Sequence, residues 1–306
     1  MNEATFSVGL VQTTCQANPE TNRERAYQGV RTAASRGAQI VCLQELFASP
    51  YLCQVEDATR FDLAETIPGP STEQSAALAR ELGVVLIVPV FERRAPGLYH
   101  NSAAVIDATG ELLGVYRKMH IPDEPQYFEK FYFAPGDLGY RVFETSFAKV
   151  GVLICWDQWY PEASRLTALR GAEVIFYPSA IGWLPHDRVT EGQAQHDAWR
   201  TIQQGHAIAN GVYVASVNRV GHEGDPAGGL HFWGQSFVCD PTGQVLTIAS
   251  DTRADVLVAT CSREVIETQR RSWPFLRDRR IESYTGLTAR YLDSPDIDPT
   301  ATSGSE

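Results

Sequence analysis

Residues 149–162 read KVGVLICWDQWYPE, and this stretch decides the fold around it. Residues 150–154 form an apolar run rich in β-branched side chains, which is typical of a buried strand. Pro161 and Glu162 are residues that commonly begin a helix. Cys155 is therefore predicted to lie where a core strand turns into a helix. Free backbone N–H groups and the positive helix end would favour its thiolate form there. A buried structural cysteine is the alternative interpretation.

Outward from this stretch, apolar strands alternate with helical patterns along the chain. This alternation, mixed with hairpins, predicts an α/β fold with a mixed sheet. No linker or repeat interrupts it, so we expect a single domain over residues 1–290. The composition of residues 291–306 is typical of a flexible tail. The expected strands cover residues 5–12, 39–43, 83–90, 150–154, 172–178, 212–217 and 255–260, the expected helices 19–36, 71–82, 161–170 and 192–210, and the hairpins 99–116 and 236–246.

Composition and charge exclude several classes of protein. Of the 306 residues, 43% are hydrophobic, which is ample for a sizeable core, and the formal net charge is -11. The acidic excess and the absence of a Lys/Arg run argue against a nucleic-acid binder. No apolar run approaches the roughly 18–20 residues that span a bilayer, and the first residues do not resemble a signal peptide. We therefore expect a cytoplasmic protein with no membrane partner.

Neither the cysteines nor the histidines indicate a metal site. The six cysteines, at positions 15, 42, 53, 155, 239 and 261, are scattered and form no CxxC pair. In a reducing compartment they are expected to be free thiols. No HExxH motif occurs, and the Gly-rich residues 221–229 lack the GxxxxGK pattern of a phosphate loop. The sequence predicts no metal and no cofactor.

Three titratable residues each follow an apolar strand, namely Glu45, Lys118 and Cys155. Sites in α/β folds gather at the carboxyl ends of strands, so we expect the three side chains to meet at one end of a sheet. Taken singly, Glu45 reads as a solvated loop carboxylate and Lys118 as a surface lysine. Together they form a chemically complete set, because a thiol nucleophile needs a base and its acyl intermediate needs an oxyanion partner.

These motifs resemble the nitrilase superfamily of carbon–nitrogen hydrolases, from the first strand to about residue 290. The family's Glu–Lys–Cys triad falls on LQELF at Glu45, on YRKMHIP at Lys118 and on GVLICWDQWYPE at Cys155. A further family carboxylate matches Glu129 in YFEKFYFAPGD. The resemblance implies a four-layer α-β-β-α sandwich with mixed sheets, and members that commonly form homo-oligomers.

The resemblance also implies a role for each residue. Cys155 would attack the carbonyl carbon of an amide or urea, and Glu45 would take the thiol proton and later activate water. Lys118 and the backbone N–H of Trp156 would stabilise the oxyanion. Glu129 would orient Lys118 or assist proton transfer. Because the thiol carries an acyl group in turn, ping-pong kinetics are expected.

The subgroup that the chain resembles most acts on a cationic carbamoyl amine. Related enzymes that act on carbamoyl amino acids bind the α-carboxylate with arginines just after the nucleophile, where this chain has Gln158 and Trp159. A carboxylate there would lack a charge-assisted partner. The candidate walls for a butyl chain are Trp156, Trp159, Tyr127, Phe131 and Trp183, and the candidate acids for its amine are Asp157, Glu124, Asp187 and Glu191. His120 would contact substrate or orient Glu129, or be structural.

Three other functions remain open at this point. One is an amidase of the same superfamily that acts on another carbamoyl or ω-amide substrate. Another is a catalytically silent interaction module, which has no reason to keep all three triad groups. A cysteine protease is disfavoured, because no Cys–His pair with an orienting Asn stands out. For the expected homo-oligomer, aromatic and arginine residues near the C-terminus are interface candidates, namely Trp273, Phe275, Arg277, Arg279 and Arg280.

Overall fold

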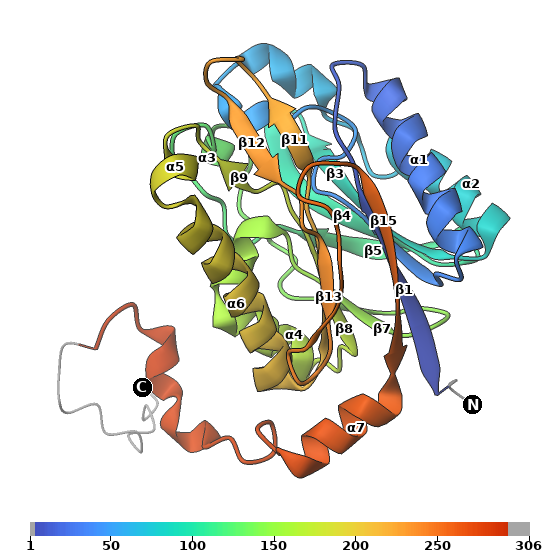
Figure 1. The fold of residues 1–306 in the computed structure, drawn as a ribbon, viewed down its shortest axis with the longest axis vertical. Coiled ribbons are helices and arrows are strands. Elements are labelled where there is room, and N and C mark those ends of the chain that lie inside the picture. Colours follow the sequence, from blue (N-terminus) through green and yellow to red (C-terminus); the bar gives the residue numbers. More distant parts are fainter. Residues whose placement is uncertain (1–3, 293–306) are drawn as a thin grey trace, which may run out of the picture.

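The computed structural model describes residues 4–292 of the chain. Two six-stranded sheets form its centre (Figure 1). The first sheet has the order β15-β1-β2-β3-β4-β5, with bounds β15 Asp255–Ser262, β1 Thr5–Gln12, β2 Ile40–Leu43, β3 Val85–Ala95, β4 Leu98–Ile106 and β5 Leu112–Arg117. The second sheet has the order β14-β13-β10-β8-β7-β6, with bounds β14 Val245–Ile248, β13 Phe237–Cys239, β10 Tyr213–Val217, β8 Val174–Pro178, β7 Lys149–Val152 and β6 Val142–Glu144.

Each sheet has three parallel strands at its centre and antiparallel strands at its edges. In the first sheet β1, β2 and β3 are parallel, and in the second β7, β8 and β10 are parallel. Parallel strands buried on both faces read as continuous apolar runs, and the five residues of β8 are all buried. The mixed sheets predicted from the sequence are confirmed.

Helices cover the outer face of each sheet. Helices α1 (Pro19–Ser35) and α2 (Pro70–Leu82) lie on the first sheet, and α4 (Pro161–Leu169) and α6 (Gly192–Asn210) lie on the opposite side, against the second (Figure 1). Asn18 caps α1 by accepting hydrogen bonds from two backbone N–H groups of its first turn. Gly83, with φ of 65°, ends α2 in the left-handed conformation that favours glycine. The result is the four-layer α-β-β-α sandwich.

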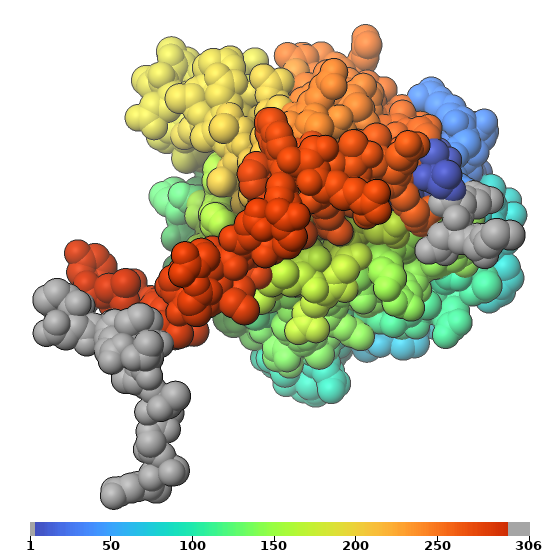
Figure 2. Space-filling model, turned by 90° about the horizontal axis from the view of Figure 1, so that it is seen from below, coloured from blue at the N-terminus to red at the C-terminus, as the bar shows by residue number. Residues whose placement is uncertain are grey.

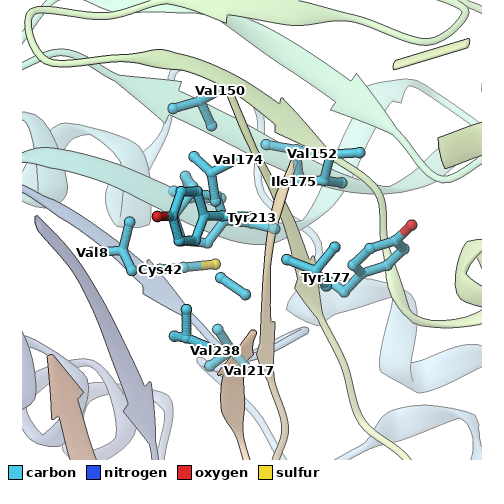
Figure 3. Close-up of a cluster of buried hydrophobic side chains, with 14 of the residues drawn as sticks. Val8, Cys42, Val150, Val152, Val174, Ile175, Tyr177, Tyr213, Val217 and Val238 are labelled. Atoms are coloured by element: carbon cyan, nitrogen blue, oxygen red, sulfur yellow. The ribbon is translucent and has the colours of Figure 1, made fainter. Parts of the chain in front are cut away.

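The core lies between the two sheets. Val8 and Cys42 of the first sheet lie close to Val174 and Val238 of the second (Figure 3). Strand β1 contacts β10, and β2 contacts β8, so the central strands of both sheets meet face to face. This packing holds the carboxyl ends of both sets of parallel strands in fixed positions relative to each other.

Five short elements complete the fold near those strand ends. A three-stranded sheet has the order β11-β12-β9, with β11 Val220–Glu223, β12 Leu230–Trp233 and β9 Gly182–Trp183. Helix α3 (Glu129–Tyr132) lies in the long segment predicted as a loop, and α5 (Asp187–Thr190) precedes α6. The Gly-rich residues 224–229 form the tip of the β11–β12 hairpin. The sequence did not predict this small sheet, because two- to four-residue strands give too short a pattern.

The end of the chain runs along the surface and away from the sandwich (Figure 2). Helix α7 (Arg263–Ser272) leads into two short 3₁₀ turns at Ile281–Ser283 and Thr285–Thr288. Of the tail predicted over residues 291–306, residues 293–306 lie outside the described part of the chain. No helix of residues 4–292 is both long enough and apolar enough to cross a membrane.

Candidate active site

Strand direction brings the three predicted residues to one end of the sandwich. Strand β5 runs parallel to β2, because it is two antiparallel steps from β3, which is parallel to β2. Glu45 follows β2 and Lys118 follows β5, so both leave the same edge of the first sheet. Cys155 follows β7 of the second sheet. Glu45 and Lys118 are fully buried, and Cys155 is 4% exposed.

Lys118 lies between two carboxylates and uses all three of its N–H groups on them. Its Nζ donates to Glu45 Oε1 at 2.9 Å, to Glu129 Oε1 at 2.9 Å and to Glu129 Oε2 at 2.7 Å. Burial acts to lower the pKa of Lys118, but the two carboxylates outweigh it and raise that pKa above its usual value. Lys118 is therefore a fixed positive charge and no nucleophile.

Glu45 has one occupied and one open oxygen. Its Oε1 accepts hydrogen bonds from Lys118 and from Asn101 Nδ2 at 2.7 Å. Its Oε2 is buried and has no hydrogen-bond partner among the described residues. A buried carboxylate oxygen without a partner is costly, and in an enzyme it is the position expected for an atom that exchanges a proton.

Cys155 lies on a sharp turn, in surroundings that disfavour its thiolate form. Its φ of 43° is in the left-handed region that side chains other than glycine rarely adopt. Burial raises the pKa of the Cys155 thiol well above its usual value, and the Glu45 carboxylate raises it further, against Lys118 and a hydrogen bond to the Ala180 backbone. The prediction that the turn favours a thiolate is wrong, because burial next to carboxylates dominates.

Helix α4 begins at Pro161, as predicted. The sequence did not predict the 3₁₀ turn, Cys155–Trp159, that lies between the strand and this helix. A short 3₁₀ turn provides little helix dipole, which is a second reason why the thiolate is not favoured. Trp156 lies in the first turn, where backbone N–H groups have no acceptor within the helix. Its N–H is therefore a suitable donor to an oxyanion.

Glu129 begins α3 and is also buried. Its Oε1 accepts a hydrogen bond from the hydroxyl of Tyr51 at 2.8 Å, in addition to those from Lys118. Burial raises the pKa of Glu129, while the adjacent Lys118 acts to lower it. This placement agrees with a role in orienting Lys118.

Asp157 and His120, both predicted as substrate-binding candidates, do not line the cavity at Cys155, and the structural alternative for His120 matches its contacts. Asp157 Oδ2 accepts from Tyr116 OH at 2.7 Å and from Ile154 N at 2.9 Å. Its Oδ1 bonds the His120 backbone N–H and Nδ1, at 3.0 and 2.7 Å. The His120 ring stacks on Tyr160 with centroids 3.6 Å apart. Asp157 thus pins the turn that carries Cys155, and His120 completes that anchor.

A cavity of about 320 Å³ opens onto Cys155 and Glu129. Three predicted aromatic residues line it, namely Trp156, Trp159 and Tyr127. The hydroxyl of Tyr127 is fixed by both the N–H and the C=O of Gly182, each at 3.0 Å. The other lining residues are Pro122, Glu124, Pro125, Ile181, Gly182, Leu184, Asp187, Gln195, Ala198 and Trp233, none of which is Lys or Arg.

Of the four candidate acids, Glu124 and Asp187 line the cavity. Burial raises the pKa of Glu124, and the neighbouring charge of Asp187 raises it further. The only ion-pair partner of Asp187 in the described chain is the exposed His186, at 2.9 Å. Neither carboxylate pairs with a Lys or Arg of residues 4–292, so the cavity offers an uncompensated negative region. Glu191, Phe131 and Trp183 do not line it.

Of the two neutral residues Gln158 and Trp159, only one lines the cavity. Trp159 lines the cavity, but Gln158 is fully buried behind the nucleophile. Its Oε1 accepts from Trp199 Nε1 at 3.0 Å and from Gln203 Nε2 at 3.3 Å, which ties the turn to α6. Residue 158 therefore says nothing about substrate charge, whereas the cavity lining does.

Sequence reasoning missed three buried residues that support the triad, namely Asn101, Tyr51 and Arg219. Asn101 lies in β4 inside an apolar strand pattern, and Arg219 lies two residues after the end of the apolar strand β10. A polar residue within or beside a core strand was the only indication available. Across residues 4–292 no group of three or more His, Cys, Asp or Glu residues is arranged to hold a metal ion.

Comparison with known proteins identifies the family. The family model described as carbon–nitrogen hydrolase matches residues 7–271. The chain belongs to the carbon–nitrogen hydrolase family. It is 45% identical to an N-carbamoylputrescine amidase of Solanum lycopersicum, over 92% of this chain and 94% of that one. It is 40% identical to a citrullinase of Francisella tularensis, over 94% and 100% of the two chains.

A solved structure shows the same fold. The crystal structure of a carbon–nitrogen hydrolase from Helicobacter pylori G27 aligns with a TM-score of 0.90 at 46% identity, covering 94% of this chain and 100% of that chain. The resemblance to the nitrilase superfamily is thus confirmed, and the protein is an amide-hydrolysing enzyme.

Proposed function

We propose that this carbon–nitrogen hydrolase converts N-carbamoylputrescine to putrescine, carbon dioxide and ammonia. The carrying observation is the cavity itself, which is lined both by the Cys155 thiol and by the carboxylates of Glu124 and Asp187. A carbamoyl group at Cys155 and a protonated amine at the carboxylates would occupy both features. The aromatic walls suit the apolar chain that joins them. The similarity to the plant N-carbamoylputrescine amidases supports the same substrate.

The first half of the reaction forms a thioester-like intermediate. Cys155 Sγ attacks the carbamoyl carbon while Glu45 Oε2 takes the thiol proton, because the thiol is neutral at the start. The positive charge of Lys118 and a hydrogen bond from the backbone N–H of Trp156 stabilise the negative oxygen. The C–N bond to the terminal amide nitrogen then breaks, Glu45 returns the proton to it, and ammonia leaves.

The second half regenerates the thiol. Water attacks the carbonyl carbon while Glu45 accepts a proton from it, and the C–S bond breaks with return of that proton to the sulfur. The product is the carbamic acid of the amine, which loses carbon dioxide and leaves putrescine. Glu129 and Tyr51 keep Lys118 in position throughout.

Citrulline is the second candidate substrate, because the citrullinase is also a close relative. Citrulline carries an α-carboxylate beside its amine. No lining residue of the cavity is Lys or Arg, so this carboxylate would have no charge-assisted partner and would lie near Glu124 and Asp187. We expect citrulline to be the poorer substrate.

Ammonia release by the purified protein tests the proposal. N-carbamoylputrescine, citrulline and N-carbamoyl-β-alanine are compared at equal concentration, with Cys155→Ala as the inactive control. The expected result is turnover of N-carbamoylputrescine well above that of the two carboxylates, and none by Cys155→Ala. Preferred turnover of citrulline would overturn the substrate assignment and leave the family chemistry in place.

We also propose that the enzyme is a homo-oligomer assembled through its C-terminal segment. Large apolar side chains are exposed there and on the neighbouring helix α4, namely Leu166, Leu169, Trp273, Phe275, Ile281 and Leu287. Exposed apolar surface of this kind is typical of an interface. Light scattering after size-exclusion chromatography should give a mass above that of one chain, and Trp273→Ser with Phe275→Ser should lower it.

Two further expectations stay predictions. The proposed reaction belongs to polyamine biosynthesis, and the cytoplasm is the expected compartment. Residues 1–290 are expected to unfold as one domain, which a single cooperative transition in denaturant would support.

A further inference from the structure

A fully buried arginine lies behind the loop that carries Glu45. Arg219 follows β10 of the second sheet and is 0% exposed. Its Nη2 donates to the backbone oxygens of Glu45 and Leu46, both at 2.9 Å. Its Nη1 donates to the backbone oxygen of Ser49 at 2.9 Å. One guanidinium thus binds three carbonyls of a single five-residue loop.

The loop needs this support because its backbone is strained. Leu46 has φ of 49°, a left-handed conformation that residues other than glycine rarely adopt because of steric strain. Such strain persists only where the surroundings fix it. The turn at Leu46 points the carbonyls of residues 45 and 46 at the same guanidinium, which is the arrangement that a planar fork of donors can hold.

The same arginine is also linked, through Glu223 and Tyr51, to the carboxylate of Glu129. Nη1 of Arg219 forms an ion pair with Glu223 Oε1 at 2.8 Å. The other oxygen of Glu223 accepts the backbone N–H of Tyr51 at 2.6 Å. The hydroxyl of Tyr51 donates to Glu129 Oε1 at 2.8 Å. The buried pair Arg219–Glu223 is therefore linked to Glu45 on one side and to Glu129 on the other.

The pair also joins the two sheets at the reactive end. Glu45 leaves the first sheet, whereas Arg219 and Cys155 leave the second. Proton transfer requires the Glu45 carboxylate to be within hydrogen-bond reach of the thiol, so the offset between the sheets matters. Arg219 lines no part of the cavity. Any effect it has on turnover must pass through the residues that it holds.

We propose that Arg219 and Glu223 are a positioning pair that sets Glu45 against Cys155 and Glu129 against Lys118. This inference rests on the proposed role of Glu45 as the base. It assigns a function in the reaction to the β11–β12 hairpin, which supplies Glu223. Weakening the contacts of Arg219 and Glu223 shifts the Glu45 carboxylate by a fraction of the length of a hydrogen bond, while the substrate cavity keeps its shape.

The test compares Arg219→Lys with Arg263→Lys. Lysine keeps the charge of residue 219 but cannot bind three carbonyls with a planar fork. Arg263 also binds a carboxylate, Glu173, and a backbone carbonyl, that of Phe147, but it lines no part of the cavity. With N-carbamoylputrescine, Arg219→Lys should lower kcat about 100-fold and leave KM within about threefold, because misplacing a catalytic group has effects of that size. Arg263→Lys should keep both values.

A second readout does not depend on the substrate. The rate at which iodoacetamide alkylates Cys155, followed by peptide mass spectrometry, depends on removal of the thiol proton by Glu45. It should fall in Arg219→Lys and stay unchanged in Arg263→Lys. A fall in this rate supports the inference even where N-carbamoylputrescine proves to be the wrong substrate, so the two proposals fail separately.

Glu223→Gln covers the case in which Arg219→Lys does not fold. One amide cannot accept from both Arg219 and the Tyr51 N–H, so the link to Glu129 should loosen while the arginine stays. The expected result is a folded protein with lower kcat and unchanged KM. The inference is overturned by either of two results in folded variants: kcat and alkylation equal to those of the wild type, or a raised KM with unchanged kcat.

Discussion

The active-site region contains two pairs of acidic residues in opposite electrostatic states. Glu45 and Glu129 are fully buried, and Lys118 lies between them with all three N–H groups engaged. Glu124 and Asp187 line the cavity, and no Lys or Arg of the described chain pairs with either. The negative charges of Glu45 and Glu129, the compensated pair, are thus balanced by Lys118. Those of Glu124 and Asp187, the open pair, are balanced by no Lys or Arg of residues 4–292.

This difference indicates what each pair does. A buried carboxylate that is already paired with a lysine cannot bind a cation from solution, but it is held rigidly enough to transfer a proton. An uncompensated pair at a cavity wall lowers the free energy of a bound cation. The same two residue types therefore serve chemistry in one place and recognition in the other, and the deciding factor is the position of one lysine.

Removing that lysine should have the largest effect. Lys118→Met leaves two carboxylates buried next to each other without a cation. We expect ammonia release to fall below detection and the free energy of unfolding to fall by about 3–5 kcal/mol, since an uncompensated buried charge is costly. Denaturant titration and the ammonia assay measure the two effects. The matched control is Lys149→Met, a surface lysine paired with Glu144, and it should change neither value. Retained activity in Lys118→Met would show that the buried pair needs no cation.

Neutralising Glu124 or Asp187 should weaken substrate binding and leave the rate of the chemical steps nearly unchanged. Glu124→Gln is expected to raise KM for N-carbamoylputrescine about tenfold with little change in kcat, because it removes a charge-assisted contact to the amine. Steady-state kinetics of ammonia release measure both. Glu191→Gln is the control, since Glu191 is a neighbouring acid that does not line the cavity. If KM stays unchanged both in Glu124→Gln and in Asp187→Asn, the amine binds to another part of the cavity wall.

The open pair should also make binding depend on pH. Burial and then Asp187 raise the pKa of Glu124, so this carboxyl takes up its proton at a higher pH than an ordinary glutamate does. As the pH falls, the charge that binds the amine is lost and KM should rise, by no more than the roughly tenfold effect of Glu124→Gln. Measuring KM from pH 8 to pH 5 at constant ionic strength tests this. In Glu124→Gln the rise should largely disappear, and an equally steep rise in that variant would contradict the assignment.

The sequence predicted Glu45, Lys118 and Cys155 because each lies shortly after a strand. All three lie within two positions of the end of an apolar run, and parallel strands bring such positions to one edge. The number of layers, in contrast, came from the family resemblance, because an alternation of strands and helices fits one sheet as well as two. That two sheets face each other is decided by long-range packing such as that of Val8 against Val174.

The supporting contacts could not be predicted, since they join residues far apart in sequence. Asn101 is 56 positions from Glu45, Tyr51 is 78 from Glu129, and Arg219 is 174 from Glu45. No local pattern encodes such pairs. Proximity in sequence was misleading in the opposite way, because Asp157 is only two residues from Cys155 and yet its side chain points back into the turn.

The smallest predicted effect concerns the contacts of Asp157. It distinguishes an acid that anchors the turn at Cys155 from one that binds substrate. Asp157 is a third acid close to the nucleophile, but its oxygens are occupied by Tyr116, Ile154 and His120. His120→Leu removes the ring nitrogen that bonds Asp157 Oδ1, while the backbone N–H of residue 120 still bonds that oxygen. We therefore expect a loss of about 1 kcal/mol in the free energy of unfolding and unchanged KM for N-carbamoylputrescine. Denaturant titration and steady-state kinetics measure these values. A tenfold rise in KM without loss of stability would show instead that His120 contacts the substrate, and Asp157 would then belong with the recognition pair.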